Sequence, residues 1–307
     1  MAPPPVALSN TNFTFYQDVA YGEHIRQRID LFLPNSASPA GLIVYFHGGG
    51  LVSGDKQQTY ELPYLRDRID QYLWANVAFA TVNYRLSNDD VTYSAKTSFR
   101  DGVRSLQFLR HYSQELGIDP ARAVAMGSSA GGAMALYIAT RDDLANPEAN
   151  QLEERQSSRV SGTFAYIPQA GYNIPRWQDT MFARFKGEGL TTERIIELAR
   201  PENVQSWLGL TTLTAIDAPA TRALRAEVDI LSHISGDDPE LYLDTDYPMN
   251  LPADYATLMH HPLHAVALLN EGEKAGVSVL AHIPDASIDT TQNEKFFDWS
   301  LRKVGAR

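Results

Sequence analysis

The chain alternates short apolar runs, rich in β-branched and aromatic residues, with longer segments whose apolar residues recur at helical spacing. The short runs predict strands over residues 25–33, 42–47, 78–84, 123–126, 161–166, 240–243 and 277–283. Several are continuously apolar, which is typical of central strands covered on both faces. The longer segments predict helices over residues 64–76, 98–116, 130–140, 263–275 and 291–304. The alternation predicts an α/β fold with a mostly parallel central sheet and helices on both faces.

One stretch interrupts this alternation. From about residue 170 to 233 no strand is evident, and several large apolar side chains lie within helix-like segments: Trp177, Met181, Phe182, Phe185 and Trp207. Long insertions inside compact domains are usually functional. We therefore expect a helical, lid-like insertion over about 170–233. Its aromatic residues either face a substrate or pack a side layer.

Composition limits the domain count and the partners. With 307 residues and 44% hydrophobic content, we expect a single domain over residues 1–307. The net charge of −11 disfavours binding to nucleic acid and to anionic lipid surfaces. No run approaches the roughly 18 apolar residues of a membrane span. The absence of cysteine rules out disulfides and Cys-based metal sites.

The start of the chain is rich in proline. Residues 1–5 read Met-Ala-Pro-Pro-Pro, without the basic flank and apolar core of a signal peptide. This favours a cytoplasmic location. The oligomeric state stays open.

The strongest motif is a strand that runs into Gly127-Ser128-Ser129-Ala130-Gly131 and then into a helix. A tight strand-to-helix turn of the form Gly-x-Ser-x-Gly lifts the serine hydroxyl clear of the backbone, and its glycines allow close approach. Ser129 is therefore the expected nucleophile. Ser128 is the rival, although it lies one residue away from the position flanked by both glycines.

A second motif lies about eighty residues upstream. There the strand at 42–46 ends in His47-Gly48-Gly49-Gly50. Such a backbone can aim its N–H groups at an oxyanion, so we expect the hole to be formed by Gly49, Gly50 and the N–H of Ala130. We interpret His47 as a hydrogen-bonding brace of this loop rather than as a base.

Together with residues 82–86 (Val-Asn-Tyr-Arg-Leu) and 117–122 (Gly-Ile-Asp-Pro-Ala-Arg), these motifs resemble the carboxylesterases related to hormone-sensitive lipase and to the feruloyl and acetyl-xylan esterases. The resemblance extends to about Gln169. It implies the α/β-hydrolase fold and a serine, an acid after the penultimate strand and a histidine after the last strand, in that order. It implies no cofactor and no metal.

The end of the chain departs from that pattern. After the last predicted strand the chain reads Pro284-Asp285-Ala286-Ser287-Ile288, which puts Ile288 where the family has its histidine. No histidine follows His282. Isoleucine cannot accept a proton, so a serine beside it would stay a poor nucleophile.

Other histidines are candidates for the missing base. His260 and His261 lie together in the loop after the penultimate strand, at the edge where the acid normally approaches the serine, and a base from there is geometrically conceivable. Their alternative role is to anchor the next helix. His282, within the last strand, is a further candidate, although a histidine in a strand more often has a structural role. We expect a structural role for His264, at the start of the next helix.

The acid is equally open. Asp246 ends the penultimate strand, and Asp254 lies deeper in the long loop that follows. Either carboxylate can orient a base, and either can instead serve a surface turn.

Two functions follow. The first is a serine carboxylesterase that acts on small carboxylic esters through an acyl-enzyme at Ser129, with a replaced histidine. The alternative is a degenerate hydrolase that binds a small ligand in the former acyl pocket. The plant gibberellin receptor is a precedent, because it resembles the same lipase family and also lacks the histidine.

Overall fold

A computed structural model describes residues 3–306; Met1 and Ala2, at the proline-rich start, and Arg307 lie outside the described residues. Its strands are β1 (Phe13–Ala20), β2 (Arg28–Pro34), β3 (Ala40–Phe46), β4 (Val77–Asn83), β5 (Ile118–Ser128), β6 (Gly162–Tyr166), β7 (Glu240–Asp244), β8 (Val279–Ile283) and β9 (Ile288–Asp289). The longer helices are α2 (Pro63–Trp74), α3 (Ala95–His111), α5 (Ala130–Thr140), α6 (Thr192–Ala199), α7 (Pro201–Trp207), α8 (Pro219–Glu227), α10 (Leu263–Ala275) and α11 (Phe296–Lys303). Short turns of helix form α1 (Gln58–Glu61), α4 (Ser113–Leu116) and α9 (Tyr255–Met259).

All strands join one sheet in the order β1-β2-β4-β3-β5-β6-β7-β8-β9. The block from β4 through β3 to β8 is parallel, whereas β1, β2 and β9 pair antiparallel at the edges. Every residue of β3 and β4 is buried, as their continuous apolar runs predict. The predicted mostly parallel sheet is confirmed.

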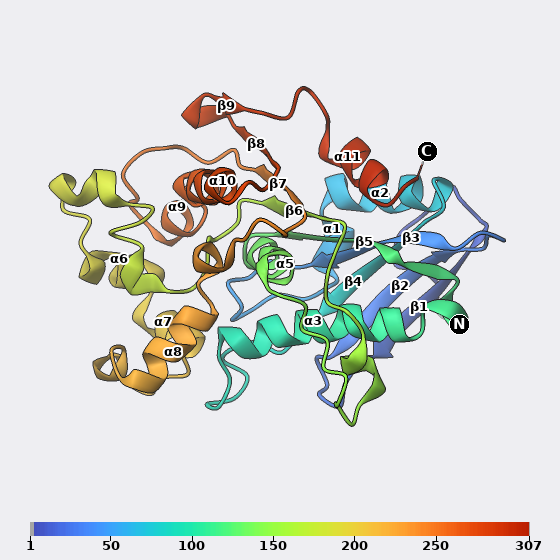
Figure 1. Ribbon diagram of the computed structural model, residues 1–307, viewed down its shortest axis with the longest axis horizontal. Helices are drawn as coiled ribbons and strands as arrows, with labels where there is room; N and C mark the ends of the chain where they lie inside the picture. Colours follow the sequence, from blue (N-terminus) through green and yellow to red (C-terminus); the bar gives the residue numbers. More distant parts are fainter. Residues whose placement is uncertain (1–2, 307) are drawn as a thin grey trace.

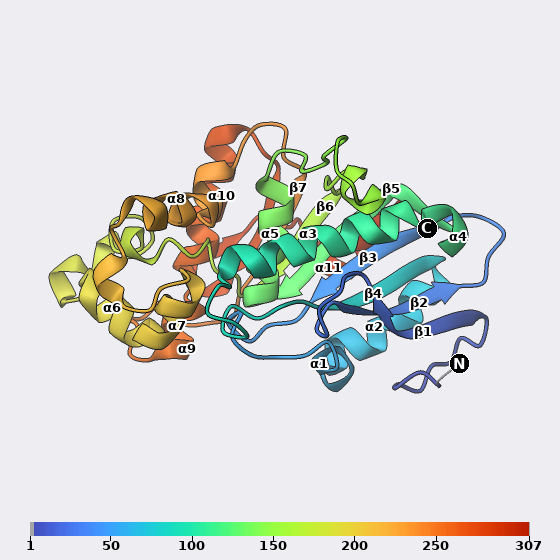
Figure 2. The same ribbon diagram turned by 90° about the horizontal axis from the view of Figure 1, so that it is seen from below.

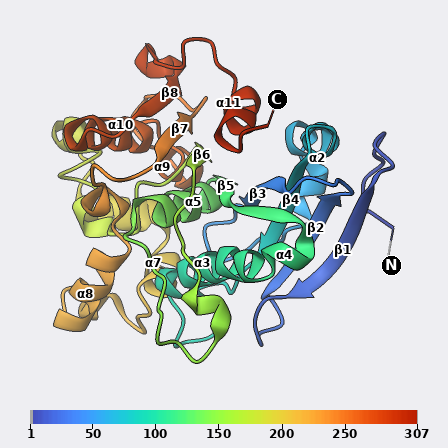
Figure 3. The ribbon, with the colours of Figure 1, turned by 45° about the vertical axis from the view of Figure 1, so that its right-hand side comes forward.

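Helices cover both faces of the sheet (Figures 1 and 3). On one face, α2 and α11 pack over a cluster that includes Ile43, Met126 and Trp299. On the other face, α3, α5 and α10 pack over a larger cluster that contains Leu42 and Ala125. From β2 to β8 the side chains of a strand alternate between the two clusters, so the pleat determines which residues face which helices.

The segment between β6 and β7 holds α6, α7 and α8 and no strand within the described residues. It projects beyond one end of the sheet (Figures 1 and 2). The five large apolar side chains noted in the sequence are at most 5% exposed and belong to the larger core cluster: Trp177, Met181, Phe182, Phe185 and Trp207. Of their two expected roles, packing of a side layer is therefore confirmed.

Several elements differ from the sequence prediction. The helix predicted over residues 98–116 is divided into α3 and α4, and β5 is longer than the predicted strand over residues 123–126. Strand β1 was missed because it is a largely exposed edge strand with a bulge before Val19, which hides the period of two. Strand β9 is only two residues long. Helix α11 begins at Phe296 rather than at residue 291, because Gln292 and Asn293 have positive φ angles and cannot continue a helix.

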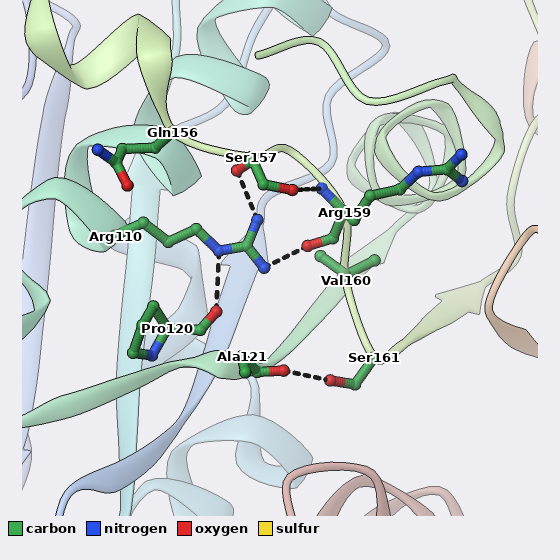
Figure 4. A pocket seen from close by; sticks show the side chains of 8 residues that line it. All are labelled: Arg110, Pro120, Ala121, Gln156, Ser157, Arg159, Val160 and Ser161. Atoms are coloured by element: carbon green, nitrogen blue, oxygen red, sulfur yellow. Dashed lines mark hydrogen bonds between the residues drawn. The ribbon is translucent and has the colours of Figure 1, made fainter. Parts of the chain in front are cut away.

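A buried cation ties α3 to two other segments at the amino end of the sheet (Figure 4). The Arg110 guanidinium donates hydrogen bonds to the carbonyls of Pro120, at 2.9 Å, of Ser157, at 2.5 Å, and of Arg159. Burial lowers the pKa of Arg110 to about 10. Because these carbonyls belong to the start of β5 and to the approach to β6, the contact fixes how both strands enter the sheet.

We expect Arg110→Met to lower the free energy of unfolding by about 1–3 kcal/mol, because three carbonyls would lose a charged donor. Urea denaturation measures the change. As a control, Arg66→Met removes an exposed arginine whose partner is the adjacent Asp67 and should change stability by less than about 1 kcal/mol. Equal effects of the two substitutions would contradict the role of Arg110.

Candidate active site

Ser129 occupies the turn between β5, which ends at Ser128, and α5, which begins at Ala130. Its φ of 55° and ψ of −122° are strained for a residue with a side chain. Backbone hydrogen bonds to β6 and α5 hold the turn: the Ser129 N–H donates to the Tyr166 carbonyl at 2.9 Å, and the Ser129 carbonyl accepts from the Ala133 N–H at 2.9 Å. The strained turn exposes the hydroxyl at the carboxyl end of the sheet.

Glycine is required on both sides of Ser129. A Cβ on Gly131 would lie 2.0 Å from the Phe46 carbonyl oxygen, and one on Gly127 would lie 2.2 Å from the Gly131 backbone. Neither clash can be relieved by a side-chain rotation, because both involve backbone atoms. The close contact also sets the end of β3, and hence the loop that starts at His47, beside the serine.

The side chain of His260 contacts the hydroxyl of Ser129. It follows Met259, the last residue of α9, and its Nε2 lies 2.8 Å from Ser129 Oγ. This distance is that of a hydrogen bond between a hydroxyl and an imidazole. Ser128, the rival serine, has no such contact with a histidine among the described residues.

Gln169 holds this arrangement together. Its buried amide donates to the Met259 carbonyl at 2.7 Å and lies 3.5 Å from Ser129 Oγ, and the Tyr172 hydroxyl donates to its Oε1 at 3.2 Å. It thereby fixes the residue before His260 relative to the serine. The sequence interpretation missed Gln169, although its place just after β6, at the carboxyl edge of the sheet, was a usable signal.

Burial lowers the pKa of His260 to about 4, and the negative charge of Asp246 partly opposes this effect. The imidazole is therefore neutral at neutral pH. With Nε2 facing the serine hydroxyl as acceptor, Nδ1 carries the proton. Nδ1 is buried and has no hydrogen-bond partner within residues 3–306. The edge of the ring packs against Tyr247, with 4.8 Å between the ring centroids.

The two candidate acids occupy different places. Asp246 accepts a hydrogen bond from the Tyr166 hydroxyl at 2.8 Å and acts on His260 through its charge. Asp254 caps the amino end of α9, where it accepts from the backbone N–H of Thr257 at 2.8 Å. Asp254 thus has the turn-forming role that the sequence left open, and its carboxylate is not among the groups that line the serine pocket.

His261 and His264 hold the backbone. The Leu263 N–H donates to His261 Nδ1 at 3.1 Å, which leaves its Nε2 to donate to the Asn250 carbonyl at 2.9 Å. His264 Nδ1 accepts a hydrogen bond from the Ala170 N–H at 3.3 Å. Of the two neighbouring histidines proposed as a base, His260 contacts the serine, and His261 is engaged elsewhere.

His282 pairs with an acid of its own. Its Nδ1 lies 2.9 Å from Asp244 Oδ1, across β7 and β8. The register places Ser128, Tyr166, Asp244 and His282 in one row across β5 to β8. Three interstrand spacings of about 4.8 Å put His282 about 14 Å from Ser128 along the sheet. This separation keeps His282 away from the serine.

The glycine-rich loop is braced at each step. Gly49 and Gly50 have φ of 110° and 65°, and the Gly50 carbonyl accepts from Trp207 Nε1 at 2.5 Å. His47 Nδ1 donates to the Gly48 carbonyl at 2.7 Å. The ring of Tyr84 stacks on His47 at 4.4 Å, and its hydroxyl donates to the His47 carbonyl at 2.7 Å. The expected bracing role of His47 is confirmed, and α7 of the insertion contributes through Trp207.

A pocket of about 360 Å³ opens over the serine and is lined in part by Gly49, Gly50, Ser129, Arg200, Tyr255 and His260. This volume lies near the lower end of the range for small-molecule sites.

No cluster of three acidic or histidine ligands suited to a metal ion occurs within residues 3–306. Over the same residues, no helix is both long and apolar enough to cross a bilayer.

The chain is similar to a known protein family and to solved structures of esterases. The BD-FAE family model matches residues 29–171. The crystal structure of an acetyl ester-xyloside bifunctional hydrolase from Caldicellulosiruptor lactoaceticus superposes with a TM-score of 0.60 at 19% identity, covering 91% of this chain and 88% of that protein. The chain has the α/β-hydrolase fold.

Two curated relatives of this chain are esterases or lipases by name. Lipase 2 of Moraxella sp. (strain TA144) is 29% identical over 48% of this chain and 35% of its own length. A probable isoprenylcysteine alpha-carbonyl methylesterase, ICMEL1, of Arabidopsis thaliana is 25% identical over 55% of this chain and 33% of its own length. The match thus spans about a third of these relatives. The resemblance to carboxylic-ester hydrolases is confirmed.

The chain departs from the implied order after β8, the last of the parallel strands. Ile288, at the position implied for the histidine, begins β9 and pairs with Ile283 of β8. Ser287, just before it, has a φ of 56°. A tight turn and a short antiparallel strand therefore occupy the place of the implied histidine loop.

The buried histidines predict how the stability of the protein depends on pH. Burial lowers the pKa to about 4 for His47, His260 and His261 and to about 3 for His264. In the unfolded chain each pKa lies near about 6.5. As the pH falls below that value, the unfolded chain binds protons that the folded chain does not. The free energy of unfolding should therefore decrease between about pH 6.5 and pH 4, by up to about 2 kcal/mol per histidine at about pH 5.

Urea denaturation at a series of pH values measures this slope. His260→Gln should reduce the slope by about one proton, because it removes one of the buried histidines. A free energy of unfolding that stays constant from about pH 7 to pH 5 would contradict the neutral, buried state of these side chains.

Proposed function

We propose that the protein is a serine carboxylesterase that hydrolyses small carboxylic esters through an acyl-enzyme at Ser129, with His260 as its base. The observation that carries the proposal is the 2.8 Å contact between Ser129 Oγ and His260 Nε2. A neutral imidazole at this distance can take the hydroxyl proton as the oxygen attacks an ester carbonyl. The protonated imidazole then gives that proton to the departing alcohol, and a water molecule repeats the sequence to release the acid.

The proposed base reaches the serine from the loop after β7 instead of the loop after β8. In the family order, the loop after the penultimate strand carries the acid. The short helix α9 brings His260 from that side, and the Gln169 contact with the Met259 carbonyl supports its position. The proposal is therefore a relocated base rather than a missing one.

The proposed oxyanion hole consists of the N–H groups of Gly49, Gly50 and Ala130. Its support is the bracing of the glycine-rich loop beside Ser129, where the positive φ angles of Gly49 and Gly50 turn the peptide groups away from an ordinary strand course. Each preorganised donor of this kind contributes about 3 kcal/mol to stabilising the transition state. Trp207 fixes the Gly50 carbonyl and so resists reorientation of this loop.

The proposed acid is Asp246, acting at a distance. Its charge favours the protonated form of His260, whereas its oxygen is bound by the Tyr166 hydroxyl rather than by Nδ1. A base with a low pKa is a weaker proton acceptor, so we infer a modest turnover.

The pocket of about 360 Å³ favours small esters. Names of the relatives, which include a lipase and a methylesterase, point to the same class of reaction.

The alternative, a degenerate hydrolase that binds a ligand without chemistry, rests on Ile288. A pure binding protein has no need of an imidazole in hydrogen-bond contact with the serine. The contact therefore favours the esterase, and the position of Ile288 is explained by a base supplied from elsewhere.

We expect His260→Gln to lower kcat/KM for 4-nitrophenyl acetate by about 100-fold or more, because a positioned general base contributes about 10²- to 10⁴-fold. Hydrolysis is followed by release of 4-nitrophenolate, and circular dichroism checks that the variant is folded.

The matched control is His282→Gln, which removes a histidine that is bound to Asp244 instead of the serine. It should leave kcat/KM within about twofold of the wild-type value, since it lies outside the pocket. Loss of activity in His282→Gln with retention in His260→Gln would reverse the assignment of the base. No ester hydrolysis by the wild-type protein would favour the binding alternative.

A further inference from the structure

Arg200 lies at the junction of α6 and α7 and lines the pocket that contains Ser129 and His260. Its guanidinium carbon stands 4.8 Å from the centre of the Tyr255 ring, a cation–π contact along the pocket wall. The Tyr255 hydroxyl in turn packs against Gly50, where an added Cβ would lie 2.5 Å from it. The Tyr255 side chain therefore lies between the Arg200 guanidinium and the glycine-rich loop.

The backbone of Arg200 is strained. Its φ of 69° and ψ of 115° form a conformation that glycine adopts freely and that is unfavourable for a residue with a Cβ. The backbone therefore provides no reason for an arginine at this position. The reason has to lie in what the side chain binds.

The charge of Arg200 is not neutralised by a nearby carboxylate among the described residues. Among the described residues that line the pocket, it is the one with a charged side chain at neutral pH. Two arginines before it are paired, Arg176 with Asp229 and Arg194 with Glu197, whereas Arg184 lies over the Phe185 ring outside the pocket. No carboxylate of residues 3–306 lies within 4.0 Å of the Arg200 nitrogens. Unlike Arg110, whose guanidinium is bound by three carbonyls, Arg200 therefore presents its charge at the serine pocket without a carboxylate partner among these residues.

We propose that Arg200 binds a carboxylate of the substrate, so that the preferred substrates are short esters that carry a second, ionised carboxylate group. This inference rests on the proposed ester hydrolysis and names its substrate class. A planar guanidinium donates two parallel hydrogen bonds to a carboxylate, which fixes direction as well as charge. The second carboxylate takes no part in the bond changes: the ester C–O bond breaks, water supplies its oxygen to the acyl group, and the alcohol leaves with a proton.

The test compares two pairs of esters with different charge. The first pair, 4-acetoxybenzoate and 4-acetoxybenzamide, places the carboxylate on the alcohol side. The second pair, mono-4-nitrophenyl adipate and 4-nitrophenyl hexanoate, places it on the acyl side. In at least one pair we expect kcat/KM to be about tenfold higher for the anion. The preference should shrink when the ionic strength rises from about 0.05 M to about 0.5 M, because salt screens a partly exposed charge.

Two variants assign this preference to Arg200. Arg200→Gln should bring the anion-to-neutral ratio of kcat/KM to about one, and Arg200→Gly should do the same while relieving the backbone strain, which protects the test against misfolding. The matched control is Arg194→Gln, which removes one positive charge from the neighbouring α6 outside the pocket and should leave the ratio unchanged.

A separate binding measurement distinguishes failure of this inference from failure of the proposed function. In Ser129→Ala, which cannot form an acyl-enzyme, calorimetry should show tighter binding of the preferred anion than of its neutral partner, and the additional Arg200→Gln substitution should abolish that difference. Hydrolysis of neutral esters without any anion preference would overturn the role of Arg200 and leave the esterase proposal intact. A preference that persists in both Arg200 variants would also overturn it.

Discussion

The contact between the glycine-flanked turn and the end of β3 is the constraint on which the site depends. The Gly131 backbone packs so closely on the Phe46 carbonyl that a single Cβ would come within 2.0 Å of it. This contact determines two things together: the strained φ of 55° at Ser129 and the start of the loop at His47. Because the loop and the turn share one packing contact, the serine and the proposed oxyanion donors are positioned relative to each other by the sheet itself rather than by flexible side chains.

A second consequence concerns the electrostatics of the base. His260 is buried, and its Nδ1 has no partner within residues 3–306, so its pKa falls to about 4. A carboxylate bonded to Nδ1 would raise that pKa and stabilise the imidazolium that forms during acyl transfer. In this protein the carboxylate at the end of β7, Asp244, is bound to His282 instead. The proposed enzyme therefore works with a serine–histidine pair on which Asp246 acts only through its charge, and its base stays neutral in mildly acidic solution.

The sequence predicted the parts of the molecule that depend on short-range patterns. The buried parallel strands, the glycines around Ser129 and the exact span of α5 follow from local periodicity and from steric limits on the backbone. The positions of Arg200 and Gln169 at the site, and the hydrogen bond from Trp207 to Gly50, escaped prediction because they arise from contacts between segments far apart in the chain. The choice between His260 and His261 was likewise open, since adjacent residues point in different directions and the turn at the end of α9 decides which of them faces the serine.

The central claim is that His260 activates Ser129, and the pH dependence of covalent labelling tests it directly. A fluorophosphonate reacts with the same activated oxygen as an ester. Peptide mass spectrometry should find the adduct on Ser129, with a labelling rate that is constant above about pH 5.5 and falls by half near pH 4, where His260 becomes protonated. An adduct on Ser128, or a labelling rate that already falls by half near about pH 6.5, the ordinary pKa of a histidine, would contradict the account.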